Sequence, residues 1–497
     1  MFSPLEIVLS LALGYLLYSI YWELTTGASR RRIIREYKCL PAKEVFDWDP
    51  ILGLRNFRAN AQAIKEHRLL DLILQRFKDN GTTFRTKLMG ISAVTTIEPE
   101  NLKVVQSLEF KKWSLGARRI HWFTDFLGPG IFSTDGQPWA HSREMLRPNF
   151  SKAQVADLNT FETHVSHLID AIPTDASTVE LQDLFFRLTI DSATEFLFGE
   201  STNCLARDTS TVSASRFANT FNKAQSQVTE KSRRGPFNVL FPDAGYAANR
   251  DYVHEFVDNF VDKAFSRRGE EKSRYIFADE LVTKTNDKYQ VRSELLNILL
   301  AGRDTTASLL SNAWWTLARR PDIFQKLQEE IAHLNGEAPD YQQIKDMKYL
   351  RAFLNESLRL HPVVPLNSRQ ALVDTTIPLG GGPDGRSPVF IPKGGVVAWS
   401  VYAMHRRKDY YGEDADEFKP ERWLGEKGLR PGWEYLPFNG GPRICLGQQF
   451  ALTEASYTTI RMLQRFKAIE SRDDRPWTEK LTFTCVGDSC LVAMIPR

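Results

Sequence analysis

The stretch Phe438-Asn-Gly-Gly441-Pro-Arg443-Ile-Cys445-Leu-Gly447 decides the fold, because it sets one cysteine in a glycine-rich turn before an apparent helix. A metal-binding cysteine is a thiolate, and backbone N–H groups and a helix N-terminus stabilise that anion. Gly441 and Gly447 allow tight turns and a close approach of the backbone to a flat ligand. Arg443 can form a forked pair with an anionic group of that ligand. Phe438 can cover the sulfur and limit its contact with water.

A buried structural cysteine in a turn is the alternative, and it would be the better interpretation of an isolated cysteine. It explains the whole pattern poorly. The pattern F-x-x-G-x-R-x-C-x-G resembles the haem-binding signature of the cytochrome P-450 family and matches it at every fixed position. The resemblance implies that Cys445 is the axial thiolate ligand of a haem b iron, with Phe438, Arg443 and Gly447 beside the cofactor.

A second landmark is the pair Glu356 and Arg359, which lie one helical turn apart. Such pairs alone are common on solvated helix surfaces. In the family that the chain resembles, the pair is buried and tied to an arginine of a later loop, and the segment Pro420–Trp423 supplies Arg422 in that place. The resemblance implies a structural ion pair that holds the loop presenting Cys445.

Three further residues resemble the family's contacts to the haem propionates. Trp139 and Arg143 lie one helical turn apart, although Arg143 taken alone would be interpreted as a surface residue. Arg369 matches a third position that often contacts a propionate. Burying a dianionic cofactor requires such cationic partners.

The segment Ala301–Thr306 lies inside a predicted long helix, Ser293–Arg320, that ends before a proline. Glycine and threonine are poor helix formers, and a threonine hydroxyl can bond back to a carbonyl, so a tolerated kink is the alternative interpretation. The segment resembles the family's oxygen-binding motif. That resemblance implies that Thr305 and Asp304 organise water and protons for cleaving dioxygen.

The activity implied is that of a haem-thiolate monooxygenase, which inserts one oxygen atom of O2 into a C–H bond. Electrons should come from a separate NADPH-dependent cytochrome P-450 reductase, because no flavin or nicotinamide domain is evident in the sequence. A haem-thiolate isomerase or dehydratase that needs no dioxygen is a rival, against which Asp304 and Thr305 argue. A non-catalytic haem-binding protein is the other rival.

The composition is that of a globular protein. The chain has 497 residues and a net charge of only +3, so the charge gives no reason to expect nucleic-acid binding. Its five cysteines are odd in number and irregularly spaced, which disfavours a disulfide framework and favours a reducing compartment.

The N-terminus predicts a membrane anchor. No residue from Ile7 to Trp22 is charged, and arginines follow at positions 30, 31, 32 and 35. Positive charge on that side favours a cytosolic body, and the absence of a basic segment before the apolar run favours an uncleaved signal anchor over a cleaved signal peptide. We therefore expect a single-pass protein of the endoplasmic reticulum membrane, in contact with lipid, whose catalytic domain faces the cytosol.

The domain organisation expected is a transmembrane signal anchor over residues 1–28, a connector over 29–50 and a haem-thiolate catalytic domain over 51–497. Helices are predicted over Leu69–Lys78 and Leu350–Leu360 and from about Leu446. The β-branched residues of Phe84–Ile97, broken by Gly90, predict a strand pair. Residues 203–274 give no clear pattern. The fold class is mainly α with a small β region, a single cytochrome P-450 type fold preceded by the anchor helix.

Longer stretches, such as 297–311 and 438–457, resemble the fungal branch of the family that hydroxylates n-alkanes and fatty acids, often at the terminal carbon. This resemblance implies a hydrophobic substrate with a long aliphatic chain. Such enzymes also oxidise alkyl chains in fungal specialised metabolites, so a tailoring oxygenase of a secondary-metabolite pathway is the alternative.

Overall fold

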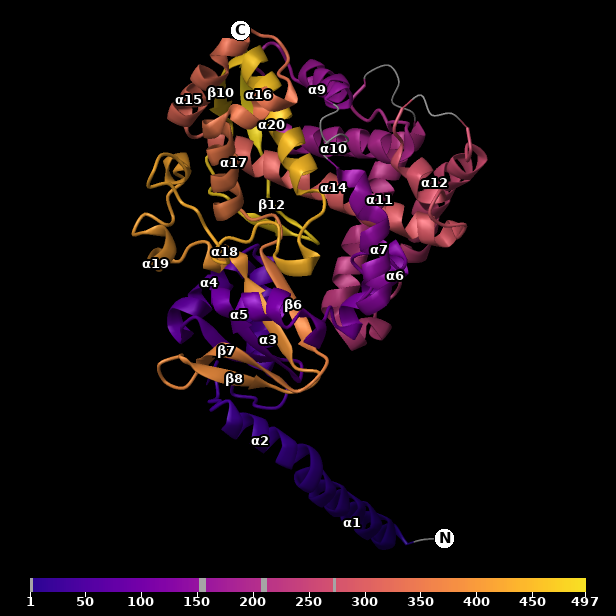
Figure 1. Ribbon diagram of the computed structural model, residues 1–497, viewed down its shortest axis with the longest axis vertical. Coiled ribbons are helices and arrows are strands. Elements are labelled where there is room, and N and C mark those ends of the chain that lie inside the picture. Colours follow the sequence, from indigo (N-terminus) through magenta and orange to yellow (C-terminus); the bar gives the residue numbers. More distant parts are fainter. Residues whose placement is uncertain (1–2, 152–157, 207–211, 271–273) are drawn as a thin grey trace. The chain divides into compact units, whose positions relative to one another are not determined.

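The computed structural model describes residues 3–151, 158–206, 212–270 and 274–497, and its elements carry the labels of Figure 1. The chain divides into two compact units. Unit 1 comprises Met1–Ala61, Ile73–Ser114 and Asn367–Ser400, and unit 2 comprises Gln62–Leu72, Leu115–Leu366 and Val401–Arg497.

Unit 1 is built on a six-stranded sheet with the order β1-β2-β3-β9-β6-β4. These strands are Lys43–Glu44, Thr83–Leu88, Ile91–Thr96, Val396–Ser400, Leu366–Ala371 and Trp113–Ser114. The antiparallel pair β2–β3 turns through Met89 and Gly90, both of which have positive φ, so the predicted strand pair broken by Gly90 is confirmed. A second hairpin joins β7 (Thr375–Gly381) to β8 (Ser387–Ile391).

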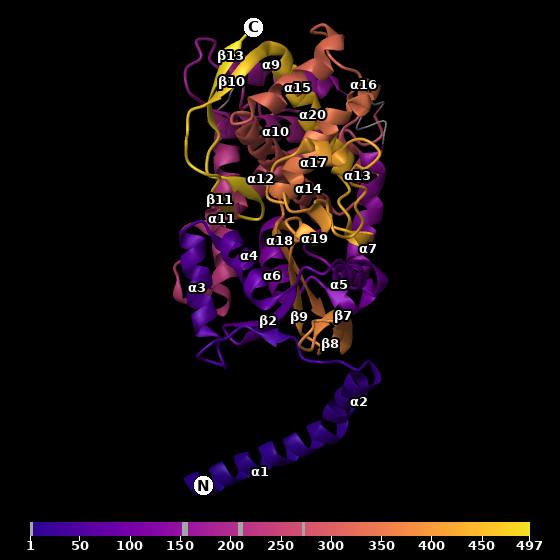
Figure 2. The same ribbon diagram turned by 90° about the vertical axis from the view of Figure 1, so that its left-hand side faces the viewer.

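The N-terminal helix belongs to unit 1 and extends away from the strands of that unit in Figures 1 and 2. It consists of α1 (Pro4–Trp22), one π-helical turn (Glu23–Gly27) and α2 (Ala28–Glu36). The whole helix of 33 residues is long and apolar enough to cross a membrane, by length and composition. Its apolar side chains are exposed, Leu11 by 69%, which fits a single-pass anchor.

Unit 2 is mainly helical and is organised around α14 (Lys288–Leu317), which packs against α10, α12, α17 and α20. This helix begins before the predicted Ser293 because the Asp287 carboxylate accepts hydrogen bonds from the N–H groups of Tyr289 and Gln290. Most of its side chains are buried, so it forms the core of the unit rather than an amphipathic surface helix.

The other α-helices are α3 (Leu54–Lys65), α4 (Leu69–Asn80), α5 (Pro99–Lys103), α6 (Ala117–Leu127), α7 (Gly136–Leu146), α9 (Asn159–Ala171), α10 (Leu181–Phe198), α11 (Val212–Arg234), α12 (Tyr246–Ser266), α13 (Phe277–Val282), α15 (Pro321–Ile331), α16 (Tyr341–Asp346), α17 (Lys348–Leu360), α18 (Val401–Met404), α19 (Lys408–Tyr411) and α20 (Gln448–Arg465). In unit 2, β10 (Phe466–Ser471), β13 (Leu491–Pro496) and β5 (Val179–Glu180) form one sheet, and β11 (Glu479–Leu481) pairs with β12 (Cys485–Gly487). Both views show β10 beside α15 and α20, near the C-terminus. The predicted fold class, mainly α with a small β region, is confirmed.

Candidate functional site

Cys445 lies in a short loop directly before α20. The Cys445 N–H donates to the Phe438 carbonyl over 3.0 Å, which closes the loop. Gly441 begins a 3-10 turn with a φ of +65°, a backbone conformation that favours glycine. The loop geometry is therefore set within the stretch Phe438–Gly447 itself, and it places the thiol at the N-terminal end of α20.

The side chain of Cys445 is exposed, so a bound molecule can reach its sulfur. The surrounding protein raises the pKa of the thiol by desolvation, whereas the Gly447 N–H and the Arg143 guanidinium lower this pKa. A thiol that a bound molecule can reach, and whose pKa nearby donors lower, is suited to bind the metal of an inserted cofactor.

Arg443 is held by the segment that leads into α7. Its Nη2 donates to Asp135 Oδ1 over 2.6 Å and to the Thr134 carbonyl over 2.8 Å. Its Nη1 donates to the Ile131 carbonyl over 3.3 Å. Burial lowers the pKa of Arg443 to about 10, while Asp135 raises this pKa, so the guanidinium is cationic at neutral pH.

The predicted pair Trp139 and Arg143 lies on α7 and reaches the same loop. Arg143 Nη1 donates to the Ile444 carbonyl, next to the cysteine, over 3.0 Å. The guanidinium of Arg443 lies 4.5 Å from the Trp139 ring centroid and that of Arg143 lies 5.9 Å from it. The structure thus brings two predicted arginines, Arg143 and Arg443, together at the ring of the predicted Trp139.

Arg119 on α6 joins this cluster, and the sequence reasoning missed it. Arg119 is close enough to lower the pKa of Arg443. Burial lowers the pKa of Arg119 itself to about 10, and the Asp135 carboxylate opposes this by raising it. In the sequence, Arg118 and Arg119 look like part of the solvated face of an amphipathic helix. Their sequence neighbours carry no signal of the tertiary contact.

The residues present fit a haem. Arg119 and Arg443 both interact with one carboxylate, Asp135, and Arg143 lies close enough to lower the pKa of Arg443. This excess of positive charge beside an accessible thiol suits a dianionic cofactor. The two haem propionates supply that charge. We therefore assign the cluster as the candidate haem-binding site.

Three other residues that the sequence predicts to contact haem have the following surroundings. Arg369 lies on β6 in unit 1, where its Nη1 donates to Asn367 Oδ1 over 3.2 Å and to the Ser368 carbonyl over 2.8 Å. The Phe438 ring is half-buried and packs against the core of unit 2. A Cβ on Gly447 would meet the Phe150 ring at 3.6 Å, an ordinary contact. The roles of Arg369, Phe438 and Gly447 toward haem stay predictions.

The predicted oxygen-activating pair lies in the middle of α14. The Thr305 hydroxyl donates to the Ala301 carbonyl over 2.7 Å, the back-bond expected of a threonine inside a helix. Asp304 is buried, and its carboxylate accepts from Arg303 Nη1 over 2.7 Å and from the Gln225 side-chain amide of α11. Asp304 is therefore charge-compensated in this structure, and its role with protons stays a prediction.

The structure brings Glu356, Arg359 and Arg422 together in the interior of unit 2. Arg359 donates to both Glu356 carboxylate oxygens over 2.8 Å, and Arg422 Nε donates to Glu356 Oε1 over 3.2 Å. The Trp423 indole adds a bond to Glu356 Oε2 over 3.0 Å. Both partners of the Glu356–Arg359 pair are fully buried.

This ion pair is connected to the segment before the cysteine loop through His405. Arg359 Nη1 donates to the His405 carbonyl over 2.8 Å, and the Leu436 N–H donates to His405 Nε2 over 3.0 Å. Burial lowers the pKa of His405 to about 3, so the ring is neutral and its Nε2 is an acceptor. The network fixes the chain two residues before Phe438.

Comparison with known proteins agrees with this site. A family model described as Cytochrome P450 matches residues 54–487. The chain is 45% identical over 463 residues to cytochrome P450 monooxygenase himC of Aspergillus japonicus, covering 91% of this chain and 82% of that protein. It is 41% identical over 495 residues to cytochrome P450 monooxygenase FPY7 of Fusarium mangiferae, covering 97% and 94%. It is 46% identical over 437 residues to cytochrome P450 52A13 of Debaryomyces hansenii, covering 84% of each.

A haem-thiolate fold with these landmarks and these relatives defines the class of protein. The chain belongs to the cytochrome P450 family, and it is a monooxygenase of that family. The predicted recognition, enzyme class and haem-thiolate cofactor are confirmed at the level of the family.

Proposed function

We propose that this monooxygenase hydroxylates a long aliphatic chain of a hydrophobic substrate, with electrons from an NADPH-dependent reductase. The observation that carries the oxygenase part is the accessible Cys445 thiol, which lies beside a cluster of guanidinium groups in the unit that also holds Thr305. The aliphatic part is supported by the resemblance to the fungal alkane and fatty-acid hydroxylases and by the 46% identity to cytochrome P450 52A13.

In this proposal Cys445 would hold the haem iron, and Trp139, Arg143, Arg443 and Arg119 would hold its propionates. Haem ligated by a thiolate supplies the chemistry that activates dioxygen. The Thr305 hydroxyl would hold a proton for the cleavage of dioxygen. The protein orients the carbon that reacts and excludes water around it.

A tailoring oxygenase of a fungal secondary-metabolite pathway is the second candidate. The relatives himC and FPY7 are each named as a cytochrome P450 monooxygenase, and their names specify no substrate. They match as much of the chain as cytochrome P450 52A13 does, so the identities alone favour neither candidate.

We also propose that the N-terminal helix anchors the protein in the endoplasmic reticulum membrane, with the rest of the chain in the cytosol. The 33-residue exposed helix and the arginines that follow its apolar part support this orientation. An apolar substrate dissolved in the bilayer would then be near the enzyme.

The decisive experiment is product identification in microsomes that contain the protein and a reductase. A panel of n-alkanes and fatty acids of graded length is supplied, and mass spectrometry identifies the oxidised products. We expect hydroxylated aliphatic products that need both NADPH and O2, and that disappear in Cys445→Ala. Turnover without O2 would instead indicate an isomerase or dehydratase. Activity toward the host's specialised metabolites, with none toward the panel, would favour the tailoring role.

A further inference from the structure

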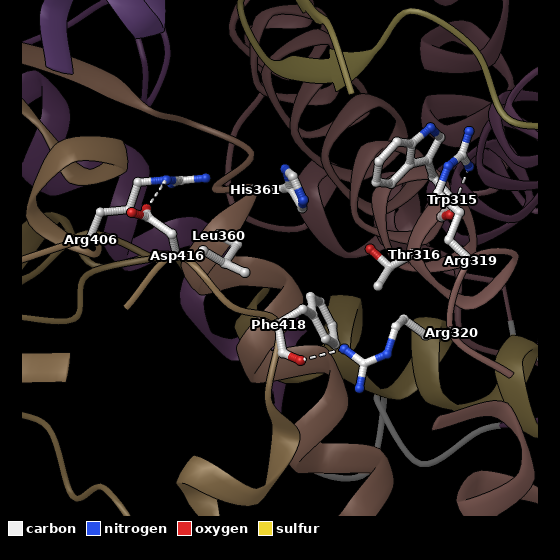
Figure 3. A pocket seen from close by; sticks show the side chains of 9 residues that line it. All are labelled: Trp315, Thr316, Arg319, Arg320, Leu360, His361, Arg406, Asp416 and Phe418. Atoms are coloured by element: carbon white, nitrogen blue, oxygen red, sulfur yellow. Dashed lines mark hydrogen bonds and ion pairs between the residues drawn. The ribbon is translucent and has the colours of Figure 1, made fainter. Parts of the chain in front are cut away.

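Unit 2 contains a pocket that lies outside the residues assigned to haem and oxygen (Figure 3). The C-terminal ends of α14 and α17 and the segment 406–418 form it, and its volume is about 240 Å³. This volume is below the roughly 300–1,000 Å³ of sites for drug-sized molecules, so it suits a small ligand. The lining residues are Trp315, Thr316, Arg319, Arg320, Leu360, His361, Arg406, Asp416 and Phe418.

Positive charge dominates the lining. Arg319, Arg320 and Arg406 face a single lining carboxylate, Asp416. Arg406 is 10% exposed whereas Asp416 is 71% exposed, and Arg406 Nε lies 3.6 Å from Asp416 Oδ1, which is longer than a hydrogen bond. Water solvates Asp416, so this carboxylate compensates part of the charge of Arg406 and leaves the rest for a ligand.

Arg319 contributes a charge that is oriented by main-chain groups. Its guanidinium lies 3.9 Å from the Trp315 ring centroid, and its N–H groups donate to the carbonyls of Trp315 and Asp473. In the part of the chain that the structure describes, no carboxylate lies within ion-pair distance of it. Burial lowers the pKa of both Arg319 and Arg406, as expected for cations that are taken out of water.

Arg320 differs from these two residues. Its Nε and Nη2 donate to the Asp322 carboxylate over 2.8 and 2.7 Å, and its Nη1 donates to the Phe418 carbonyl over 2.9 Å. The charge of Arg320 is therefore compensated by Asp322, and its side chain forms part of the pocket wall. The charge available to a ligand comes from Arg319 and Arg406.

His361 lies between these two arginines in Figure 3, and its Nδ1 is a buried atom that has no hydrogen-bond partner among the described residues. Burial and the charges of Arg406 and Arg359 lower the pKa of His361 to about 3, so the imidazole is neutral. A neutral ring can offer either a donor or an acceptor at Nδ1. An unpartnered buried nitrogen is costly, and a ligand would satisfy it.

From this geometry we infer that the pocket binds a small phosphate group, paired with Arg319 and Arg406 and hydrogen-bonded to His361. A phosphate dianion balances two cations and accepts forked hydrogen bonds from guanidinium groups on more than one side. The site is separate from the proposed oxidation and does not depend on its substrate. Inorganic phosphate and a small phosphomonoester share the chemistry that the pocket recognises.

The test is calorimetric titration of the full-length, haem-loaded protein in detergent at low ionic strength, with inorganic phosphate, glycerol 3-phosphate and acetate as separate probes. We expect saturable binding of at least one phosphate probe and a higher thermal midpoint when it is bound, because a ligand of the folded state stabilises it. Acetate should bind at least tenfold more weakly. The stronger of the two phosphate probes distinguishes free phosphate from a phosphomonoester.

Two variants with opposite expected effects on the phosphate affinity make the test more specific. Arg319→Gln should weaken phosphate binding at least tenfold, whereas Asp416→Asn should tighten it severalfold because it removes the competing carboxylate. Arg472→Gln, whose side chain is 40% exposed and lies outside the pocket, is the matched control and should change nothing. Asp416→Asn alters an exposed side chain, so it decides the question even where Arg319→Gln fails to fold. The proposal is wrong where neither phosphate probe binds, where acetate binds as tightly, or where Asp416→Asn leaves the affinity unchanged.

Discussion

The thiol of Cys445 receives its position from backbone contacts within its own loop and its electrostatic environment from α7. The bond from its N–H to the Phe438 carbonyl sets the loop, and Arg143 lowers the pKa of the thiol while donating to the neighbouring Ile444 carbonyl. A change at the sulfur should therefore remove haem binding while the loop backbone keeps its bonds.

Cys445→Ala should abolish the red-shifted Soret band that thiolate ligation gives the reduced carbonyl complex, because no other group replaces the sulfur. The measurement is the reduced carbon monoxide difference spectrum of purified protein, together with haem content. Cys204→Ala, at a half-buried thiol, is the control and should leave the band intact. Retention of both haem and the band in Cys445→Ala would show that the ligand is elsewhere.

Thr305→Ala should leave haem binding intact but divert reducing equivalents from product, because it removes the hydroxyl proposed to hold a proton for the cleavage of dioxygen. The measurement is the ratio of product formed to NADPH consumed. Thr305 also bonds to the Ala301 carbonyl, so the control must lose a similar helix bond. Ser308→Ala meets that need, since the Ser308 hydroxyl donates to the Asp304 carbonyl over 2.7 Å. Equal coupling in the two variants would contradict the proton role of Thr305.

Among the single residues of the site, the sequence predicted those that lie in short local patterns better than those that only the tertiary fold brings in. Cys445, Arg443, Trp139 and Arg143 could be found because each lies in a short pattern. Arg119 could not, because its partner Asp135 lies in the segment before α7 and only folding brings their charges together.

Between elements, the Glu356 carboxylate connects α17 to the loop that leads to the cysteine. It accepts from Arg359, Arg422 and Trp423, and it also accepts from the Lys419 N–H over 2.9 Å. Removing one member of a buried ion pair leaves an uncompensated charge, which costs more than the pair contributes.

Glu356→Gln should destabilise the protein by about 3–5 kcal/mol, because two buried guanidinium groups lose their shared counter-charge. The checks are the thermal midpoint and the rate of haem loss. Lys326→Gln breaks a pair with Glu421 in which both side chains are more than 40% exposed, and it should cost about 0–1 kcal/mol. A cost for Glu356→Gln no larger than that control would mean that the buried pair does not hold the loop.

A second buried carboxyl, Glu454 on α20, makes stability depend on pH. Ser192 of α10 donates to it, and burial raises the pKa of Glu454 from 4.5 to about 8. The folded state therefore keeps a proton on Glu454 that the unfolded state releases above about pH 4.5. The stability that this difference contributes is complete below that pH and is lost as the pH rises to about 8. Over this window the free energy of unfolding should fall by up to about 1.4 kcal/mol per pH unit.

Glu454→Gln should reduce that slope, because the amide resembles the protonated acid and does not titrate. The measurement is the thermal midpoint between pH 7 and 8, just below the pKa of Glu454. Glu294, whose pKa burial raises to about 7, gives most of its own contribution to the slope below pH 7. Glu470→Gln, at a side chain that is 55% exposed, is the control. An unchanged slope in Glu454→Gln would show that this carboxyl is ionised in the folded protein.

Elements with a clear periodicity could be predicted, and those with a mixed surface could not. The β-branched run before and after Gly90 predicted β2 and β3. Residues 203–274 contain α11 and α12, whose buried positions repeat at helical spacing but stand among many polar residues. Their contact is aromatic, with Phe217 stacked on Phe256 at 3.9 Å between ring centroids, and such pairing across helices leaves no local pattern.

In the molecule as a whole, the N-terminal helix is the element whose proposed function, membrane anchoring, is separate from the folding of the rest of the chain. Its apolar side chains are exposed along α1, so they contribute no core to unit 1. The link to the unit comes later, where Arg30 Nε donates to Asp374 Oδ2 over 3.1 Å. The apolar part should therefore be separable from folding, although the sequence alone left a cleaved signal peptide as an alternative.

Deletion of residues 2–27 should convert the enzyme from an integral membrane protein into one that carbonate washing extracts from microsomes, with its carbonyl-complex spectrum retained. The cut removes the apolar helix but keeps Arg30 and its bond to Asp374, so unit 1 should stay folded. N-terminal sequencing of the full-length protein from microsomes supplies the control, because an uncleaved anchor begins at the original N-terminus and a signal peptide does not. Membrane retention of the truncated chain after the carbonate wash would place the anchor elsewhere. Loss of the spectrum would show that the helix supports the fold as well as the membrane attachment.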